Sequence, residues 1–167
     1  MSGKNLILYY TWVGNTEVVA EEIQRQTGFK MLQITERQER QKNKIMGSAM
    51  SAFLGFGSRL NPMDYSFSGY EGLYLGAQVW AGKTTPAINT FLRKAQLKDK
   101  RVWLFLTKAD DKVSQKVIDS ISARIEKRGG TLVDTLSITA PWDPRNPTIL
   151  SPETIKDQVR NWLQQHD

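Results

Sequence analysis

Cysteine is absent from this chain of 167 residues, and histidine occurs only once, at His166. A chain without cysteine forms no disulfide, offers no thiol nucleophile and holds no metal through thiolates. A zinc site would need an unusual ligand set made of oxygens alone. Serine hydrolase chemistry is disfavoured as well, because no G-x-S-x-G stretch occurs and no credible histidine base is present. We therefore expect no catalytic side chains and no bound metal.

Long apolar runs are also missing. The first ten residues, MSGKNLILYY, hold too short an apolar stretch for a signal peptide or a transmembrane helix. We expect a soluble, cytoplasmic protein without a membrane span. Hydrophobic residues make up 40% of the chain and charged residues 24%, as in ordinary globular proteins. The length suits a single domain over residues 1–167.

Acidic residues are too few to balance the basic ones, and the formal net charge is +6. A basic surplus can serve a nucleic acid, an anionic membrane or an acidic partner. The bases are scattered, however, and the densest stretch, RQERQKNK over 37–44, also contains an acid. We interpret the surplus as a solvated surface and expect no nucleic-acid partner.

What the chain does contain is an alternation of two apolar spacings. Runs typical of strands occupy the ranges 5–10, 29–34, 72–77, 102–107 and 132–138. Helical spacing occurs at 16–26, 88–95, 113–125 and 155–163. Gly28 after the first helix and Ser151-Pro152 before the last one are typical helix-end signals. The alternation predicts an α/β domain of three layers around a mostly parallel sheet.

Residues 36–69 interrupt this alternation. They contain an apolar helical face made by Ile45, Met46, Ala49, Met50, Phe53 and Leu54. We interpret the stretch as an inserted segment with a helix of its own. It could serve as a lid, as a dimer surface or as a patch on an anionic membrane, although packing against the core is the preferred interpretation.

The first candidate site follows the first predicted strand, where residues 9–16 read YYTWVGNT. Gly14 allows a tight turn close to an anion. The backbone amides of the turn would point into it, and Thr11 and Thr16 add hydroxyl donors. The following helix would place its positive end there. The stretch therefore predicts a phosphate site, and a plain helix cap at Asn15 or Thr16 is the alternative.

The stretch T-x-V-G-N-T resembles the flavodoxin phosphate loop, [S/T]-x-T-G-x-T, which holds the phosphate of FMN. The resemblance implies the phosphate-loop residues Thr11, Trp12, Val13, Gly14, Asn15 and Thr16. Val13 departs from the family, which carries a hydroxyl there. A hydrogen bond to a charged group contributes about 1.5–3 kcal/mol. FMN binding would therefore be weaker by about one to two powers of ten unless a neighbour substitutes.

A second stretch, YEGLYLGAQVWAGKTTPAINTFL over 70–92, resembles the flavodoxin segment whose loop packs an aromatic ring against the isoalloxazine. The residues in register are Gly76, Trp80, Pro86, Phe91 and Leu92, whereas Gln78 replaces a proline and Glu71 an aspartate. By this resemblance the flavin would contact Gln78, Val79, Trp80, Ala81 and Gly82. Trp80 would stack on the ring, and a plain core position for it is the alternative.

The third loop, TKADDK, follows the fourth predicted strand and occupies the position of the family's second flavin-contacting loop. It lacks the usual glycines and aromatic residue. Thr107, Lys108 and Ala109 could offer backbone amides to the pyrimidine edge of the flavin. Asp110 or Asp111 as the cap of the next helix is the alternative for this loop, and the preferred one.

The resemblance implies a flavodoxin-like fold with a five-stranded parallel sheet in the order 2-1-3-4-5 and helices on both faces. It also implies an FMN-binding redox protein that passes electrons to a protein partner or a small acceptor. Flavodoxin carriers are usually acidic, and the net charge of +6 departs from that pattern. This departure keeps an NAD(P)H-dependent, quinone-type reductase open. A further alternative is a flavodoxin fold that has lost FMN and acts through protein interactions.

Overall fold

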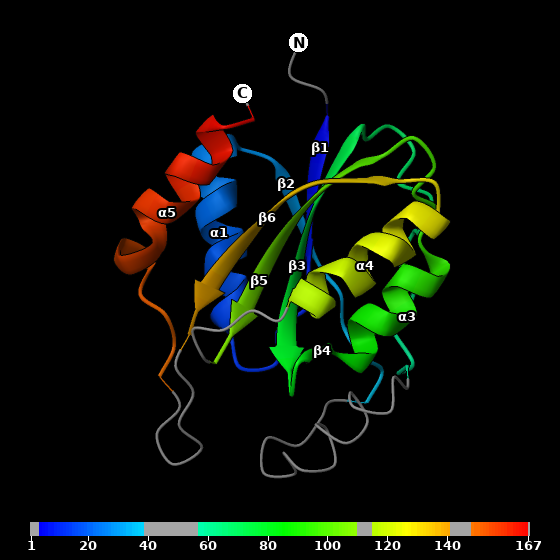
Figure 1. Ribbon diagram of the computed structural model, residues 1–167, viewed down its shortest axis with the longest axis horizontal. Helices are drawn as coiled ribbons and strands as arrows, with labels where there is room; N and C mark the ends of the chain where they lie inside the picture. The colour runs from blue at the N-terminus through cyan, green and yellow to red at the C-terminus, as the bar shows by residue number, and fades with distance from the viewer. Residues whose placement is uncertain (1–3, 39–56, 110–114, 141–147, 167) are drawn as a thin grey trace.

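The computed structural model describes residues 4–38, 57–109, 115–140 and 148–166, which build a twisted sheet between two pairs of helices (Figure 1). The long strands are β1 (Asn5–Tyr9), β2 (Lys30–Gln33), β3 (Gly72–Trp80), β5 (Arg101–Lys108) and β6 (Thr131–Thr139). They follow the order β2-β1-β3-β5-β6, and each pairing between neighbours is parallel. Numbered along the chain, these strands confirm the predicted order 2-1-3-4-5.

One strand was not predicted from the sequence. β4 (Lys83–Thr84) turns back on the end of β3 and pairs with it antiparallel. β3 itself extends to Trp80, three residues beyond the apolar run that ends at Ala77. A two-residue strand carries no measurable periodicity, so the sequence pattern could not reveal it.

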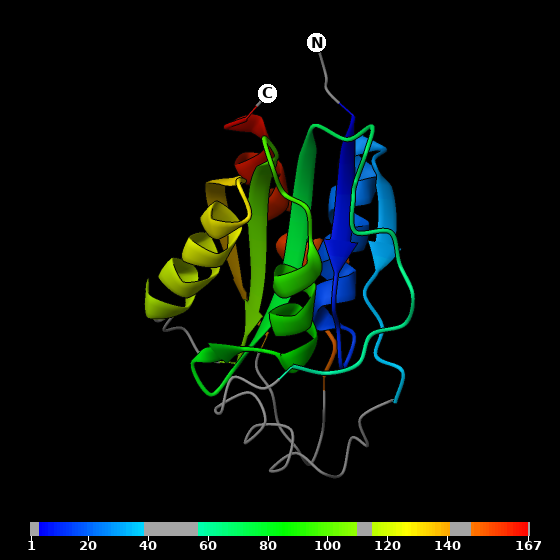
Figure 2. The ribbon, with the colours of Figure 1, turned by 90° about the vertical axis from the view of Figure 1, so that its right-hand side faces the viewer.

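Helices cover both faces of the sheet, as predicted. α1 (Asn15–Thr27) and α5 (Pro152–Gln164) lie on one face, and α3 (Pro86–Lys94) and α4 (Gln115–Lys127) lie on the other (Figures 1 and 2). α1 ends at Gly28, whose φ of 72° and bond to the carbonyl of Gln24 are typical of a glycine cap. Ser151 precedes α5 as its N-cap residue. Among the described residues, no helix combines the length and apolar character needed to span a membrane.

Each face of the sheet has its own apolar core, because successive strand residues point to opposite sides. Leu6 and Leu8 of β1 join the core beneath α3 and α4. Ile7 and Tyr9 of the same strand join the core beneath α1 and α5. The buried continuous run of β1 is therefore explained by helices on both sides.

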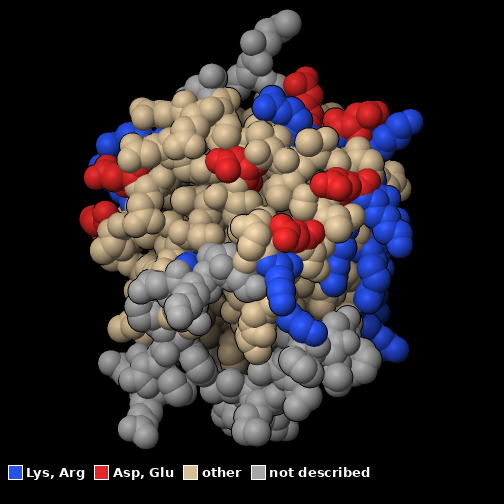
Figure 3. Space-filling view, in the orientation of Figure 1, with Lys and Arg blue, Asp and Glu red and all other residues tan. Residues whose placement is uncertain are grey.

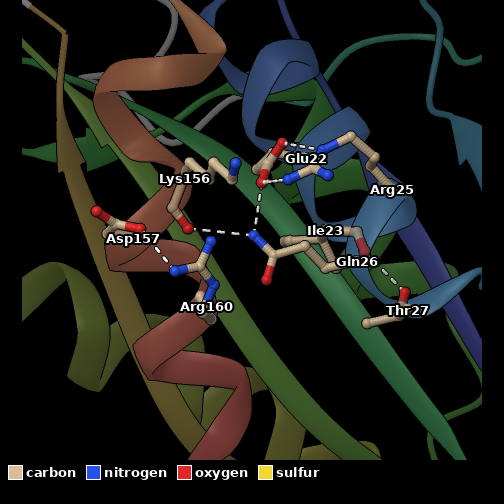
Figure 4. A network of polar contacts seen from close by, with 8 residues as sticks. All are labelled: Glu22, Ile23, Arg25, Gln26, Thr27, Lys156, Asp157 and Arg160. Atoms are coloured by element: carbon tan, nitrogen blue, oxygen red, sulfur yellow. Dashed lines mark hydrogen bonds and ion pairs between the residues drawn. The ribbon is translucent and has the colours of Figure 1, made fainter.

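A buried acid helps to fasten α1 to α5 (Figure 4). The Glu22 carboxylate accepts hydrogen bonds from Arg25 Nε and Nη2 at 2.8 and 2.6 Å and from Gln26 Nε2 at 2.5 Å. Gln26 Nε2 also donates to the carbonyl of Lys156 on α5 at 3.1 Å. The Arg25 bond lowers the pKa of Glu22 below its usual range, although burial opposes the shift. The acid thus stays ionised at neutral pH, with its charge matched by Arg25.

The single histidine has a structural place. Trp162 Nε1 donates to Asp134 Oδ2 at 2.9 Å, and His166 Nε2 lies 2.9 Å from the same oxygen. Burial raises the pKa of Asp134, but its hydrogen bonds with His166, the Thr135 backbone and Trp162 outweigh burial and lower it. These contacts fasten the end of α5 to β6 near its start, at the opposite end of the strand from the predicted loops.

The described part of the inserted segment runs along the α3 side of the sheet. Glu36 and Leu60 form an isolated antiparallel bridge, and Leu60 and Phe67 are buried in the core beneath α3. Residues 57–69 thus pack against the core, whereas the apolar face for which core packing was predicted is not among the described residues. The helix predicted from Ile45 to Leu54 lies outside the described residues.

Gly76, in the middle of β3, lies against aromatic side chains. A Cβ added there would stand 2.3 Å from the ring of Phe105 and 2.9 Å from Cβ of Tyr9. Any larger side chain would therefore push apart strands whose ends carry the predicted loops. The glycine is required by packing and not by an unusual φ, because Gly76 is not among the glycines with positive φ.

We expect Gly76→Ala to lower the free energy of unfolding, measured by urea denaturation, by about 1–3 kcal/mol, the usual cost of an overpacked core. The matched test is the double variant Gly76→Ala/Phe105→Leu. Removal of the ring makes room for the new methyl group, so the two losses should be less than additive. Strictly additive losses would show that the Phe105 ring is not the cause.

Candidate functional site

The turn after β1 is built by a glycine in a conformation that other residues rarely adopt. Gly14 has φ 104° and ψ −14° and is the N-cap residue of α1. Its N–H donates to Thr11 Oγ1 at 3.0 Å, which closes the turn on itself. A hydroxyl that accepts one hydrogen bond can still donate another. The turn therefore presents the Thr11 hydroxyl beside the start of a helix.

Two predicted phosphate-loop side chains point inward instead. Thr16 Oγ1 lies 2.7 Å from Thr107 Oγ1, and both side chains are buried. Asn15 Oδ1 accepts a hydrogen bond from the N–H of Leu150 at 2.8 Å. These side chains join the turn to the end of β5 and to the segment before α5. Neither caps α1, because Gly14 holds the N-cap position and no side-chain cap bond forms.

The groups left to meet an anion are backbone amides. The first N–H groups of a helix, here at Asn15, Thr16 and Glu17, have no acceptor within the helix. The same end of α1 carries the positive pole of the helix dipole, equivalent to about half an elementary charge. The carboxylate of Glu17 is engaged by Tyr9, whose OH donates to it at 2.9 Å. Burial, then this bond, raises the pKa of Tyr9, which keeps the phenol protonated.

Ile149 belongs to this site although the sequence did not point to it. Its Cδ1 lies 3.4 Å from where a Cβ on Gly14 would stand, so its side chain lies beside the turn. Ile149 is 59% exposed, an unusual position for a large apolar residue. The neighbouring Leu150 is the residue whose N–H binds Asn15, and that bond holds the segment in place. A contact between residues so far apart in the chain has no local signal.

The second predicted loop is a tight hairpin. Val79 pairs with Thr84 and Trp80 with Lys83, so that Ala81 and Gly82 make the turn. Their φ values are 47° and 71°, the pattern of a two-residue type I′ hairpin. Positive φ suits glycine and strains alanine mildly. The turn residues are exposed, and the strands hold Trp80 at a fixed place beyond the sheet.

The two loops meet through a pair of tryptophans. The ring centroids of Trp12 and Trp80 lie 5.2 Å apart with planes inclined by 66°, an edge-to-face contact. Both indoles are half-buried and pack against the core beneath α3. Trp80 is therefore neither a fully buried core residue nor a free surface residue. The sequence predicted a role for each, but not that they touch.

Gln78 connects the loops by a hydrogen bond. Its Oε1 accepts from the N–H of Trp12 at 2.6 Å, and its side chain is 7% exposed. Gln78, which replaces a proline of the resembled segment, thus fastens the end of β3 to the turn after β1. The third predicted loop contributes Thr107, buried against Thr16, then half-buried Lys108 and exposed Ala109. The alternative cap at Asp110 or Asp111 lies outside the described residues.

The structure was compared with known proteins. No family model matches the sequence, and no curated protein resembles it significantly. A protein from Bacteroides uniformis assigned as a flavoprotein shares the fold with a TM-score of 0.74 at 17% identity, covering 96% of this chain and 99% of its own. A flavoprotein from Lactobacillus acidophilus, solved in complex with FMN, gives 0.65 at 23% identity over 81% and 93%. Oxidised flavodoxin 1 from Bacillus cereus gives 0.55 at 18% identity over 99% and 100%.

These likenesses cover nearly the whole chain in two cases, and they show that the fold is flavodoxin-like. The predicted fold is confirmed. At these sequence identities the likeness shows only the arrangement of strands and helices. The chemistry of the site depends on its own residues.

We expect Gln78→Leu to lower the free energy of unfolding by about 1–3 kcal/mol, because the Trp12 N–H loses this acceptor in a buried place. The matched control is Gln33→Leu, a glutamine on the exposed strand β2. It should change stability by less than about 0.5 kcal/mol. Equal effects of the two variants in urea denaturation would show that the Gln78 bond contributes nothing particular.

Proposed function

We propose that this protein binds FMN and transfers electrons to a protein partner or to a small acceptor. The observation that carries the proposal is the meeting of the Gly14 turn with the Trp12–Trp80 pair at one edge of the sheet. β1 connects to β2 on one side, and β3 lies on its other side. The site thus lies at the point where strand order reverses, where open α/β sheets bind ligands.

The phosphate of FMN would lie at the start of α1. Backbone N–H groups there, the helix dipole and the Thr11 hydroxyl all favour an anion. The inward bonds of Asn15 and Thr16 position those amides, so these two side chains would act as supports. Apolar Ile149 beside the turn would help to exclude water from the phosphate. A support from comparison is that the similar Lactobacillus acidophilus flavoprotein holds FMN.

The flavin ring would lie against an indole. Trp12 and Trp80 offer flat apolar faces, and stacking on either removes apolar surface from water. Thr107 and Lys108 are the last residues of β5 and Ala109 follows it at the same edge, where backbone amides would face the pyrimidine side of the ring. The bound flavin would accept and release the electrons, while these residues hold it and keep water away. No acid or base among the side chains is needed for such a transfer.

A second candidate function has its own support. Polar side chains of the site already have partners within the protein: Gln78 accepts from the Trp12 backbone N–H, Thr16 bonds with Thr107, and Asn15 accepts from the Leu150 backbone N–H. A site closed in this way suits a flavodoxin-like fold that has lost FMN and acts through protein contacts. A reductase that draws on NAD(P)H remains the further alternative, and the net charge of +6 suits an anionic cosubstrate.

We expect the purified chain to quench the fluorescence of added FMN at micromolar concentration, and Trp80→Leu to raise the dissociation constant about tenfold or more through loss of stacking and buried area. Tyr70→Leu is the matched control. This half-buried aromatic residue precedes β3 at the other end of the sheet, and its loss should leave the constant unchanged. No quenching at micromolar FMN would favour the interaction protein instead.

Val13→Thr tests where the phosphate lies. The new hydroxyl can donate to an anion in the turn, so FMN should bind about ten to a hundred times more tightly. Val13→Ala serves as the control, since it changes size without adding a donor. Weaker binding by the threonine variant, measured in the same titration, would place the phosphate elsewhere.

A further inference from the structure

A basic pocket lies between α3 and α4, apart from the loops described above. Its volume is about 280 Å³, and its lining residues are Asn89, Leu92, Arg93, Arg124, Lys127 and Arg128. Of the described residues that line it, four are cationic and none is acidic. Basic side chains gather along the edge of the molecule that α3 and α4 form in Figure 3. No acidic side chain among these lining residues balances their positive charge.

One arginine of the pocket, Arg124, has a neutral hydrogen-bond partner. Arg124 Nη1 donates to Asn89 Oδ1, and Thr84 Oγ1 donates to the same oxygen at 2.6 Å. Asn89 is only 3% exposed. Burial, then the nearby charge of Arg93, lowers the pKa of Arg124 below its usual value. Among the described residues, the contacts of this half-buried guanidinium are a neutral amide and a neighbouring cation, so its charge is not neutralised by a carboxylate.

Arg93 is also placed by neutral groups. Its Nη2 donates to Thr90 Oγ1 at 3.1 Å, and that hydroxyl donates to the carbonyl of Ser58 at 2.8 Å. Arg93 and Arg124 therefore each have a neutral hydrogen-bond partner; Arg124 is half-buried, whereas Arg93, Lys127 and Arg128 are exposed. Fixed guanidinium forks match the oxygens of phosphate groups better than mobile ammonium groups do.

The negative ends of the helix dipoles offset only part of the positive charge of the pocket. Arg93 lies in the last turn of α3, and Arg124 and Lys127 lie in the last turn of α4, where cations are favourable. The two helix ends together supply about one negative elementary charge. The four cations of the pocket exceed that several-fold. The remaining positive charge is a local surplus that attracts anions.

We propose that the pocket between α3 and α4 binds a small anion with two or more phosphate groups. Its volume lies near the lower limit of small-molecule pockets, which fits a pyrophosphate unit and suits an extended acidic peptide poorly. Leu92 gives the site an apolar wall beside the charges. None of the residues that line the pocket belongs to the loops that follow β1 and β3, and the proposal stands whether or not FMN binds there.

The test is a calorimetric titration of the full chain, saturated with FMN where FMN binds, with inorganic pyrophosphate at physiological ionic strength. One molecule should bind per chain. Lys127→Gln/Arg128→Gln removes two exposed charges of the rim and should weaken binding at least tenfold without affecting folding. Lys94→Gln/Lys116→Gln removes two charges from the same helices outside the pocket and should change binding less than threefold.

Three results would overturn the proposal. Equal weakening by both double variants would show a diffuse response to net charge. Loss of binding in Thr11→Val, with no loss in the rim variant, would assign the anion to the turn after β1. Binding of a ten-residue glutamate peptide without any binding of pyrophosphate would make the pocket a docking surface for an acidic protein. Arg124→Gln, checked by circular dichroism for folding, should also abolish pyrophosphate binding.

Discussion

The structure depends on one constraint: parallel neighbours β1 and β3 end at the same edge of the sheet while their connections leave in opposite directions. That geometry brings the Gly14 turn and the Trp80 hairpin together although they lie far apart in the chain. A hydrogen bond of 2.6 Å from the Trp12 N–H to Gln78 Oε1 then holds the turn against the end of β3. The indoles of Trp12 and Trp80 touch as a consequence. The candidate cofactor site at this edge depends on that arrangement.

The polar side chains of the site serve mainly to hold its backbone. Two hydrogen bonds, Thr16–Thr107 and Asn15–Leu150, hold the backbone around the Gly14 turn, which is the frame of the site. A neutral hydrogen bond contributes about 0.5–1.5 kcal/mol to stability, and leaving such a group buried without a partner costs more. The frame therefore positions the first amides of α1 in advance, and an anion bound there would interact with preorganised dipoles. Backbone geometry would then supply the basic affinity, and hydroxyls in the turn, such as that of Thr11, would add to it.

The sequence predicted the long strands and two helix ends because these follow from repeated apolar spacing and from Gly28 and Ser151. The strand order was implied by the resemblance, since apolar spacing alone leaves the order open. The sequence could not predict β4, which is too short to show a period, nor the place of Ile149 beside Gly14. The same limit applies to Gln78: the sequence shows only that it replaces a proline of the resembled segment, whereas the structure shows that it accepts a hydrogen bond from the Trp12 N–H. Such contacts join residues through the fold and leave no pattern in the chain.

The buried side-chain amide of Asn89 links the basic pocket to the hairpin of the candidate cofactor site. Asn89 Oδ1 accepts from Arg124 on the pocket floor and from Thr84, which pairs with Val79 in the hairpin that carries Trp80. A carboxylate at position 89 would have neutralised Arg124, but it would also have reduced the positive charge of the pocket. The asparagine satisfies the hydrogen bonds and leaves the charge in place. Four like charges in one pocket attract anions, and two of them are oriented through neutral groups, so the pocket suits an anionic ligand.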